Sequence, residues 1–245
     1  MINIITVNWN NLKGLTLTLN SLKRQTFDKE KWRLIVVDGF STDGSQELLI
    51  SEKSHIDTLI IEKDKGVYDA MNKGIENVNE GDYFLFLNSG DEFASDDVLK
   101  KLDSIIKNDN EKTNVFYGDK IDEAGKLKKP FHPKSMEYGI INACHQCILY
   151  RKTKGFKYDL KYRLFSDLDF TIKYYKTGSK FKYIPIPIAI YEGGGLSSVH
   201  KWGTKIEIYQ IVYRQFGFVK FFRFISVKSL KFIGVKHTAF LNQHE

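Results

Sequence analysis

The sequence predicts an α/β fold in which a mainly parallel sheet is flanked by helices and is followed by a basic, aromatic helical segment. Three observations carry this prediction. Short apolar segments alternate with segments of helical periodicity over roughly the first 120 residues. The chain, at 245 residues, is long enough for one large domain with its own core. Its apolar fraction of 42% excludes a disordered chain.

The N-terminal segment begins the alternation. Residues 2–9, INIITVNW, are almost all apolar and predict a buried strand. Four leucines then recur at helical spacing over residues 12–22. WRLIVVD, at 32–38, predicts a second strand, and the polar loop GFSTDGS leads into a helix near residues 46–53.

The same pattern continues along the chain. TLIIE at 58–62 predicts a third strand, and apolar residues at helical spacing follow between positions 67 and 78. YFLFL at 83–87 predicts a fourth strand, Ser95 is a suitable helix cap, and NVFYGD at 114–119 predicts a fifth strand. Short connections between such elements indicate βαβ units, hence a parallel sheet with helices on both faces.

The second half is less regular. EAGK at 123–126 predicts a hairpin turn, and NACHQCILY at 142–150 predicts a strand. A helix is expected to start at Ser166, and residues 183–191 form an extended segment. The stretch 193–198 predicts a flexible loop, and its glycine run at 193–195 indicates a loop that closes over a bound ligand.

Polar residues stand at the ends of the predicted strands. Because ligands of parallel sheets bind outside the carboxyl ends of the strands, these residues predict a functional rim. The rim consists of Asn8, Asp38, Glu62, Asn88, Asp91 and Asp119.

Composition narrows the possible partners. The net charge of +7 favours an anionic partner such as a nucleotide or a phospholipid. Cys144 and Cys147 are the only cysteines, and we interpret them as core thiols and not as a redox or zinc motif. Two cysteines suit a reducing cytoplasm, no signal peptide is recognised, and no apolar run reaches the roughly 18 residues that span a bilayer.

Four motifs together resemble GT-A fold glycosyltransferases of the family 2 type. They are ITVNWNN with the L.SL..Q spacing after it, WRLIVVDGFSTDGS, DKGVYDAMNKGIENVNEGDYFLFLNSGDEF, and HQCILYRK with FSDLDFTIK followed by YEGGGLS. The resemblance covers residues 2 to about 198. It implies a catalytic domain at 1–200, with a nucleotide-sugar half at 1–120 and an acceptor half at 121–200. Residues 201–245 would then form a helical tail.

The resemblance also implies a donor site and a metal site. UDP is the expected nucleotide, with Asp38 accepting a hydrogen bond from the pyrimidine imide, while Asp43 orders its loop. Asn88-Ser89-Gly90-Asp91 stands where the family has D-x-D, so Asp91 is expected to hold Mn²⁺ or Mg²⁺. His200 is expected either to complete this site or to be an exposed loop residue. The expected donor-binding residues are Val7, Asn8, Asp38, Asp64, Lys73 and Asn88.

Two carboxylates compete for the role of catalytic base. Ser166 and Asp169 have the spacing of a capping box, which makes Asp169 structural and leaves Asp167 in the first helical turn to face the cleft. The resemblance also places the base at Asp167. It further implies that His145 and Gln146 line the acceptor side.

The expected reaction is inverting transfer of a sugar from a nucleotide-sugar to a hydroxyl of a saccharide acceptor in bacterial polysaccharide synthesis. The resemblance implies an acceptor linked to undecaprenyl diphosphate. A nucleotidyltransferase that makes nucleotide-sugars is an alternative, but VNWNNLKG does not resemble that class's basic, Gly-rich loop. A non-enzymatic nucleic-acid-binding protein is a second alternative, and the acidic rim argues against it.

The stretch from Lys201 to Phe240 mixes basic and aromatic residues. On a helix, such residues can lie flat in a lipid interface, with rings inward and charges toward anionic headgroups. We therefore expect a cytoplasmic protein that associates peripherally with the inner face of the cell membrane.

Overall fold

The computed structural model describes residues 1–191 and 201–232, and the side chains of all these residues except 201–205 and 227–232. The first half of the chain contains β1 (Ile2–Asn8), α1 (Leu12–Lys23), β2 (Trp32–Asp38), α2 (Ser45–Ser51), β3 (Thr58–Ile61), α3 (Val67–Glu76) and β4 (Tyr83–Phe86). Each of these elements lies where the sequence predicts one, within a few residues.

The second half contains β5 (Glu92–Phe93), α4 (Val98–Lys107), β6 (Val115–Ile121), β7 (Leu127–Lys128), β8 (Ile148–Arg151), α5 (Ser166–Lys176), β9 (Phe181–Ile190) and α7 (Lys201–Phe232). The predicted hairpin turn joins β6 to β7. The strand predicted over 142–150 is shorter, because a 3-10 turn, η4 (His145–Cys147), precedes β8. Three more such turns are η1 (Lys29–Lys31), η2 (Lys53–His55) and η3 (Pro133–Tyr138).

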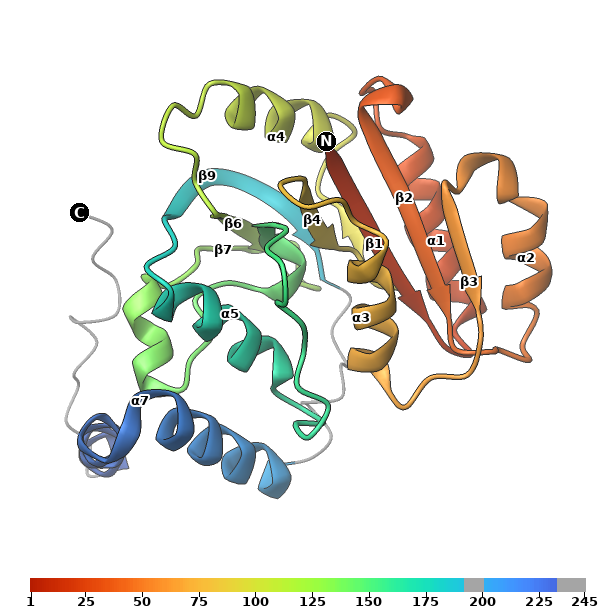
Figure 1. Ribbon diagram of the computed structural model, residues 1–245. Helices are drawn as coiled ribbons and strands as arrows, with labels where there is room; N and C mark the ends of the chain where they lie inside the picture. The colour runs from red at the N-terminus through yellow and green to blue at the C-terminus, as the bar shows by residue number, and fades with distance from the viewer. Residues whose placement is uncertain (192–200, 233–245) are drawn as a thin grey trace.

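One sheet runs through the molecule in the order β3-β2-β1-β4-β8-β6-β9-β5, with β7 paired to β6 (Figure 1). Strands β1 to β4 are parallel, and β8 lies antiparallel between β4 and β6. Strand β9 is parallel to β6, so both run in the direction of β4. The prediction of a mainly parallel sheet is therefore confirmed.

Helices cover both faces of the sheet. Side chains of β2 alternate, so that Leu34 and Val36 pack with α1, α2 and α4, whereas Ile35 and Val37 pack with α3 and α5. Because these strands are covered on both faces of the sheet, their sequences are continuously apolar. Cys147 lies in the first of these cores, and both cysteines are free thiols.

The C-terminal helix α7 lies against α5 and η3, away from β1–β3 (Figure 1). It consists of two helical segments joined at Gly217, whose φ of 76° lies in the region that favours glycine. Ile211 of the first segment is fully buried in a small core with Leu168 and Ile172 of α5. Over the described residues, no helix is both long and apolar enough to cross a membrane.

Candidate active site

The carboxyl ends of β1, β2 and β4 lie side by side because these strands are parallel neighbours. With the start of α3 they border a cleft of about 790 Å³. Val7, Asn8, Asp64 and Asn88, four of the residues predicted to bind the donor, line this cleft. The topology therefore brings them together at the predicted rim.

Two aromatic residues that the sequence interpretation missed also line the cleft. Trp9 is 70% exposed and Phe40 is 49% exposed. Phe40 has a φ of 64°, which is unusual for a bulky side chain and recurs at functional sites. Exposed rings beside a cleft can stack on a nucleobase. The sequence signal for both rings is their position one or two residues after the end of a strand, at Asn8 and at Asp38.

Three buried oxygen atoms of residues that line the cleft lack hydrogen-bond partners among the described residues. They are Asn8 Oδ1, Asn88 Oδ1 and Ser89 Oγ. Buried polar atoms are nearly always paired, so each unpaired one requires an explanation. Because all three lie at the ends of β1 and β4, they indicate a place where a ligand, an ion or water completes the site.

Asp38 orders the loop after β2. Its Oδ1 accepts a hydrogen bond from the backbone N–H of Ser41 at 2.7 Å, and its Oδ2 accepts from the Ser41 hydroxyl and the Asn8 amide, both at 2.7 Å. The side chain is fully buried and is not part of the cleft lining. A contact between Asp38 and a nucleobase would require one of these bonds to be exchanged. The predicted contact stays a prediction. The carboxylate that lines the cleft is Asp64.

Lys73 and Asp43 both have partners within the protein. Lys73 Nζ donates to the Lys63 carbonyl at 2.8 Å and pairs with Glu62 at 2.8 Å. It does not line the cleft, and its predicted contact with the donor stays a prediction. Asp43 accepts from the backbone N–H of Ser45 in its own loop at 3.1 Å, as expected of a loop-ordering residue, and from that of Leu12 on α1 at 2.8 Å.

Asp91 lies in a tight turn after β4. Gly90, with a φ of 107°, supplies the conformation that the turn needs. The Thr18 hydroxyl on α1 donates to the Asp91 carbonyl at 2.7 Å and accepts from the Gly90 N–H at 3.0 Å. Asp91 is 5% exposed, and its Oδ2 accepts from the Gln146 side-chain amide at 2.9 Å. His200, the other predicted metal ligand, lies outside the described residues.

The donor set suits a hard divalent cation. Mg²⁺ and Mn²⁺ favour oxygen ligands, and the turn offers the Asp91 carboxylate and the unpaired Asn88 Oδ1. Residues 1–191 and 206–226 contain no group of three or more His, Cys, Asp or Glu that could hold a metal. Asp91 and Asn88 would hold a cation that keeps phosphate and water oxygens in its shell.

The Asp167 carboxylate faces the first turn of α3. The Tyr68 hydroxyl donates to the Leu164 carbonyl at 3.0 Å and lies 3.4 Å from Asp167 Oδ1. The Leu168 backbone N–H donates to the same oxygen at 2.8 Å. Burial outweighs these bonds and raises the pKa of Asp167 to about 6. Tyr68 directly follows Gly66 and Val67, which line the cleft at the ends of β1 and β4, whereas Asp167 is not part of the lining of that cleft.

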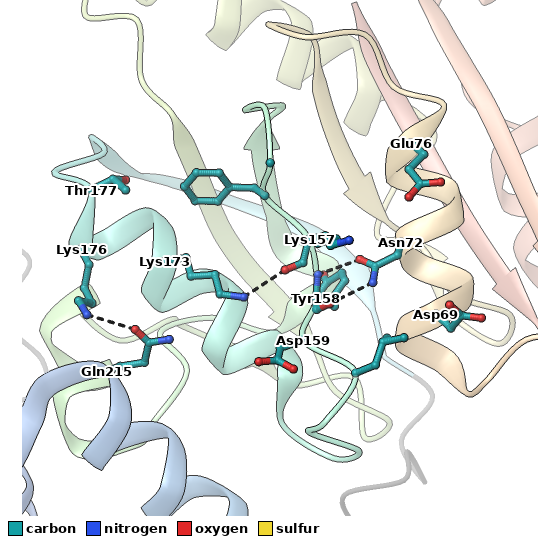
Figure 2. Close-up of a pocket in the computed structure, with 13 residues that line it drawn as sticks. Asp69, Asn72, Glu76, Lys157, Tyr158, Asp159, Lys173, Lys176, Thr177 and Gln215 are labelled. Atoms are coloured by element: carbon teal, nitrogen blue, oxygen red, sulfur yellow. Dashed lines mark hydrogen bonds between the residues drawn. The ribbon is translucent and has the colours of Figure 1, made fainter.

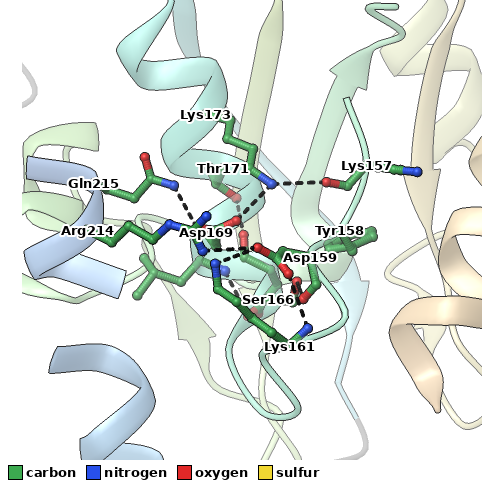
Figure 3. Close-up of polar contacts among 12 residues, drawn as sticks. Lys157, Tyr158, Asp159, Lys161, Ser166, Asp169, Thr171, Lys173, Arg214 and Gln215 are labelled. Atoms are coloured by element: carbon green, nitrogen blue, oxygen red, sulfur yellow. Dashed lines mark hydrogen bonds and ion pairs between the residues drawn. The ribbon is translucent and has the colours of Figure 1, made fainter. Parts of the chain in front are cut away.

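Asp169 is held in a polar network (Figure 3). Its Oδ1 accepts from Gln215 at 2.7 Å, and Lys173 pairs with it at 2.9 Å. The predicted capping box is wrong, because Ser166 is already helical and its hydroxyl donates to the Asp159 carbonyl. Asp169 is nevertheless structural, since the network joins α5 to α7.

The predicted acceptor-side pair makes contacts within the protein. His145 is 8% exposed, stacks on Phe86 with ring centroids 4.9 Å apart, and bonds the Tyr158 hydroxyl at 2.6 Å. Burial lowers the pKa of His145 to about 4, so the ring is neutral at pH 7. Gln146 orients Asp91, a role that the sequence interpretation did not foresee. That the pair lines the acceptor side stays a prediction.

A second groove of about 870 Å³ lies between α3, α5 and α7 (Figure 2). Its floor is the loop at 155–160, which Asn72 holds by accepting from the Tyr158 N–H at 2.8 Å and donating to the Tyr158 carbonyl at 3.0 Å. Lys173 donates to the Lys157 carbonyl at 3.2 Å. The groove contains none of the residues predicted to bind the donor.

Curated relatives support the predicted family. The chain is 33% identical over 209 residues to the "PGL/p-HBAD biosynthesis glycosyltransferase" of Mycobacterium bovis (strain BCG / Pasteur 1173P2), covering 81% of this chain and 79% of that protein. It is 28% identical over 144 residues to the "Putative teichuronic acid biosynthesis glycosyltransferase TuaG" of Bacillus subtilis, covering 56% of this chain and 55% of that one.

Solved structures confirm the GT-A fold. Staphylococcus aureus TarS 1–349, in complex with UDP-GlcNAc, matches with a TM-score of 0.71 at 17% identity over 87% of this chain and 66% of that chain. The mannosyltransferase PcManGT of Pyrobaculum calidifontis, in complex with GDP-Man and Mn²⁺, matches with a TM-score of 0.61 at 14% identity over 94% and 64%. The chain thus spans about two thirds of each solved structure.

The family model "Glycosyl transferase family 2" matches residues 3–191. This match runs from β1 to the residue after β9 and includes the cleft and Asp167. The match argues against the two alternatives from the sequence, a nucleotidyltransferase and a nucleic-acid-binding protein. The chain therefore belongs to glycosyl transferase family 2, and the activity of this family is sugar transfer.

Proposed function

We propose that this protein is an inverting glycosyltransferase that moves a sugar from a UDP-sugar to a hydroxyl of a lipid-linked saccharide. The observation that carries the proposal is the pairing of two features from different halves of the chain. A cleft with unpaired oxygens lies at the ends of β1 and β4, and a carboxylate with a raised pKa lies across the first turn of α3.

The cleft side chains suit a nucleotide. Trp9 and Phe40 offer exposed rings for the base, and base–aromatic stacking contributes about 1–3 kcal/mol per base. Asp64 offers a carboxylate at the same wall, where it can accept from an imide N–H of uracil. The likeness to TarS solved with UDP-GlcNAc supports UDP as the nucleotide.

The turn after β4 would receive the diphosphate. Asp91 and Asn88 would hold Mn²⁺ or Mg²⁺, which when bound neutralises the charge that develops on the leaving diphosphate. Gln146 keeps the Asp91 carboxylate in one orientation. The solved complex of PcManGT with GDP-Man and Mn²⁺ supports a divalent cation for this fold.

Asp167 would act as the base. The acceptor oxygen forms a bond to C1 of the sugar as the bond from C1 to the diphosphate oxygen breaks, and Asp167 takes the hydroxyl proton. Attack from the face opposite the diphosphate inverts C1. A carboxyl with a pKa of about 6 is ionised at pH 7 and is more basic than an ordinary aspartate.

The last element of the proposal is the acceptor. We propose a saccharide on a lipid carrier such as undecaprenyl diphosphate, with His145 and Gln146 on the acceptor side and transfer at the inner face of the cell membrane. Relatives named for PGL/p-HBAD and teichuronic acid biosynthesis support a role in the synthesis of bacterial glycans.

A panel of UDP-, GDP- and dTDP-sugars tests the proposal, with Mn²⁺ or with a chelator. We expect UDP-sugars with Mn²⁺ to raise the melting temperature most and to release UDP slowly. Failure of every nucleotide-sugar to stabilise the chain would refute the donor assignment. Retention of configuration at C1 in the product, measured by NMR, would refute the inverting mechanism.

A further inference from the structure

The second segment of α7 exposes an unusual amount of apolar surface. Phe218 is 68% exposed, Val219 82%, Phe222 62% and Ile225 37%. These positions, spaced i, i+1, i+4 and i+7, share one side of a helix. We call this side, Phe218, Val219, Phe222 and Ile225, the outer face. Its two phenylalanine rings lie 6.2 Å apart and form a continuous aromatic surface.

The opposite side of the same segment fixes its orientation. Phe224 is 1% exposed, and its ring lies 5.3 Å from that of Tyr209 in the first segment. Phe221 packs on Tyr209 and Tyr213, with centroids at 6.2 and 5.4 Å. The kink at Gly217 lets the two segments fold against each other. The outer face therefore points away from the protein because its apolar counterpart is already buried.

A positive charge borders the outer face. Arg223 borders it one turn after Val219, is exposed, and forms no ion pair with any residue that the structure describes. Between Ile208 and His244 the sequence has six lysines and arginines and no aspartate or glutamate. They are Arg214, Lys220, Arg223, Lys228, Lys231 and Lys236. Of these, Lys220 pairs with Glu137 and Arg214 with Asp159, and the side chains of Lys228, Lys231 and Lys236 lie outside the described residues. Exposed aromatic rings beside Arg223 fit a surface that is apolar beneath and anionic on top.

We propose that the outer face of α7 docks on an anionic lipid bilayer. Phe218, Val219 and Phe222 would enter the interface between headgroups and acyl chains, and Arg223 would contact lipid phosphate. A second copy of this chain fits less well, because two outer faces would bring like charges together. This inference does not depend on the proposed chemistry, since the outer face lies outside the donor cleft.

The test uses the full chain and vesicles of phosphatidylcholine with 0–40% phosphatidylglycerol. The variant is Phe218→Ser with Phe222→Ser, and its matched control is Ile50→Ser on α2, because Ile50 is 63% exposed. We expect binding that rises with phosphatidylglycerol and falls with salt, that is weakened at least about tenfold in the double variant, and that is unchanged in the control. Arg223→Gln should weaken binding to anionic vesicles only.

Two further measurements keep the outcome decisive. Circular dichroism checks that each variant melts like the wild type, as expected for replacements of exposed side chains. Sedimentation equilibrium without vesicles reports the oligomeric state. Equal vesicle binding by the wild type and the double variant would overturn the proposal, as would no binding at low salt. A dimer that the double variant abolishes would instead assign the outer face to a second copy.

Discussion

Replacement of Asp167 by asparagine is expected to lower turnover strongly and at the same time to stabilise the fold. Burial raises the pKa of Asp167 from its ordinary value of 3.8 to about 6. Such a group is harder to ionise in the folded chain than in the unfolded chain by up to about 3 kcal/mol. Asparagine keeps the shape and carries no charge, so the variant should gain up to this amount in free energy of unfolding at pH 8.

The sign of the pH dependence follows from the raised pKa. The cost is fully present above pH 6, shrinks as the pH falls from 6 to 3.8, and is gone below pH 3.8, where the carboxyl is protonated in both states. Urea unfolding at several pH values measures this gap between variant and wild type. Turnover should fall by about 10²–10⁴-fold, since asparagine cannot take the proton.

Asp169→Asn is the matched control, two residues along the same helix. Asp169 is 1% exposed and is bound by Lys173 and Gln215, so its replacement should cost about 1–3 kcal/mol of stability with turnover little changed. If Asp167→Asn were less stable than the wild type at pH 8, the carboxyl would not be desolvated. If Asp169→Asn lost turnover and Asp167→Asn kept it, the two roles would be reversed.

Three further predictions concern the same site. Tyr68→Phe removes a hydroxyl that lowers the pKa of Asp167, so the acid limb of the kcat/KM profile should move from about pH 6 to higher pH. If the limb does not move, Tyr68 does not influence the base. Asp91→Ala should abolish Mn²⁺-dependent binding of UDP, and Gln146→Leu should weaken it by about 10–100-fold in calorimetry, because Gln146 orients Asp91; binding that persists in chelator would contradict both. Trp9→Ala should raise the KM for the donor by loss of about 1–3 kcal/mol of stacking and leave kcat nearly constant; a fall in kcat at unchanged KM would place Trp9 elsewhere.

The sequence by itself determined the elements of the fold and the rim. Continuous apolar segments form β1, β2 and β4, and their polar C-terminal residues meet because parallel strands end at one edge. Gly90 and Asp91 in a turn after β4 could also be foreseen, since turn chemistry is local. Such features depend on residues that are near neighbours in the chain. Hydrophobic periodicity therefore predicts these features from the sequence alone.

The tertiary structure alone decided which side chains meet across the site. Gln146 bonds Asp91 across 55 positions, and Tyr68 reaches Asp167 across 99. The loop after β2 folds back on β1, so that the Asp38 carboxylate accepts hydrogen bonds from Ser41 and Asn8, and its contact with a ligand stays a prediction. These contacts depend on how separate elements pack, and residue type and local spacing do not encode that packing. The desolvation that raises the pKa of Asp167 likewise arises only when surrounding elements partly bury this residue.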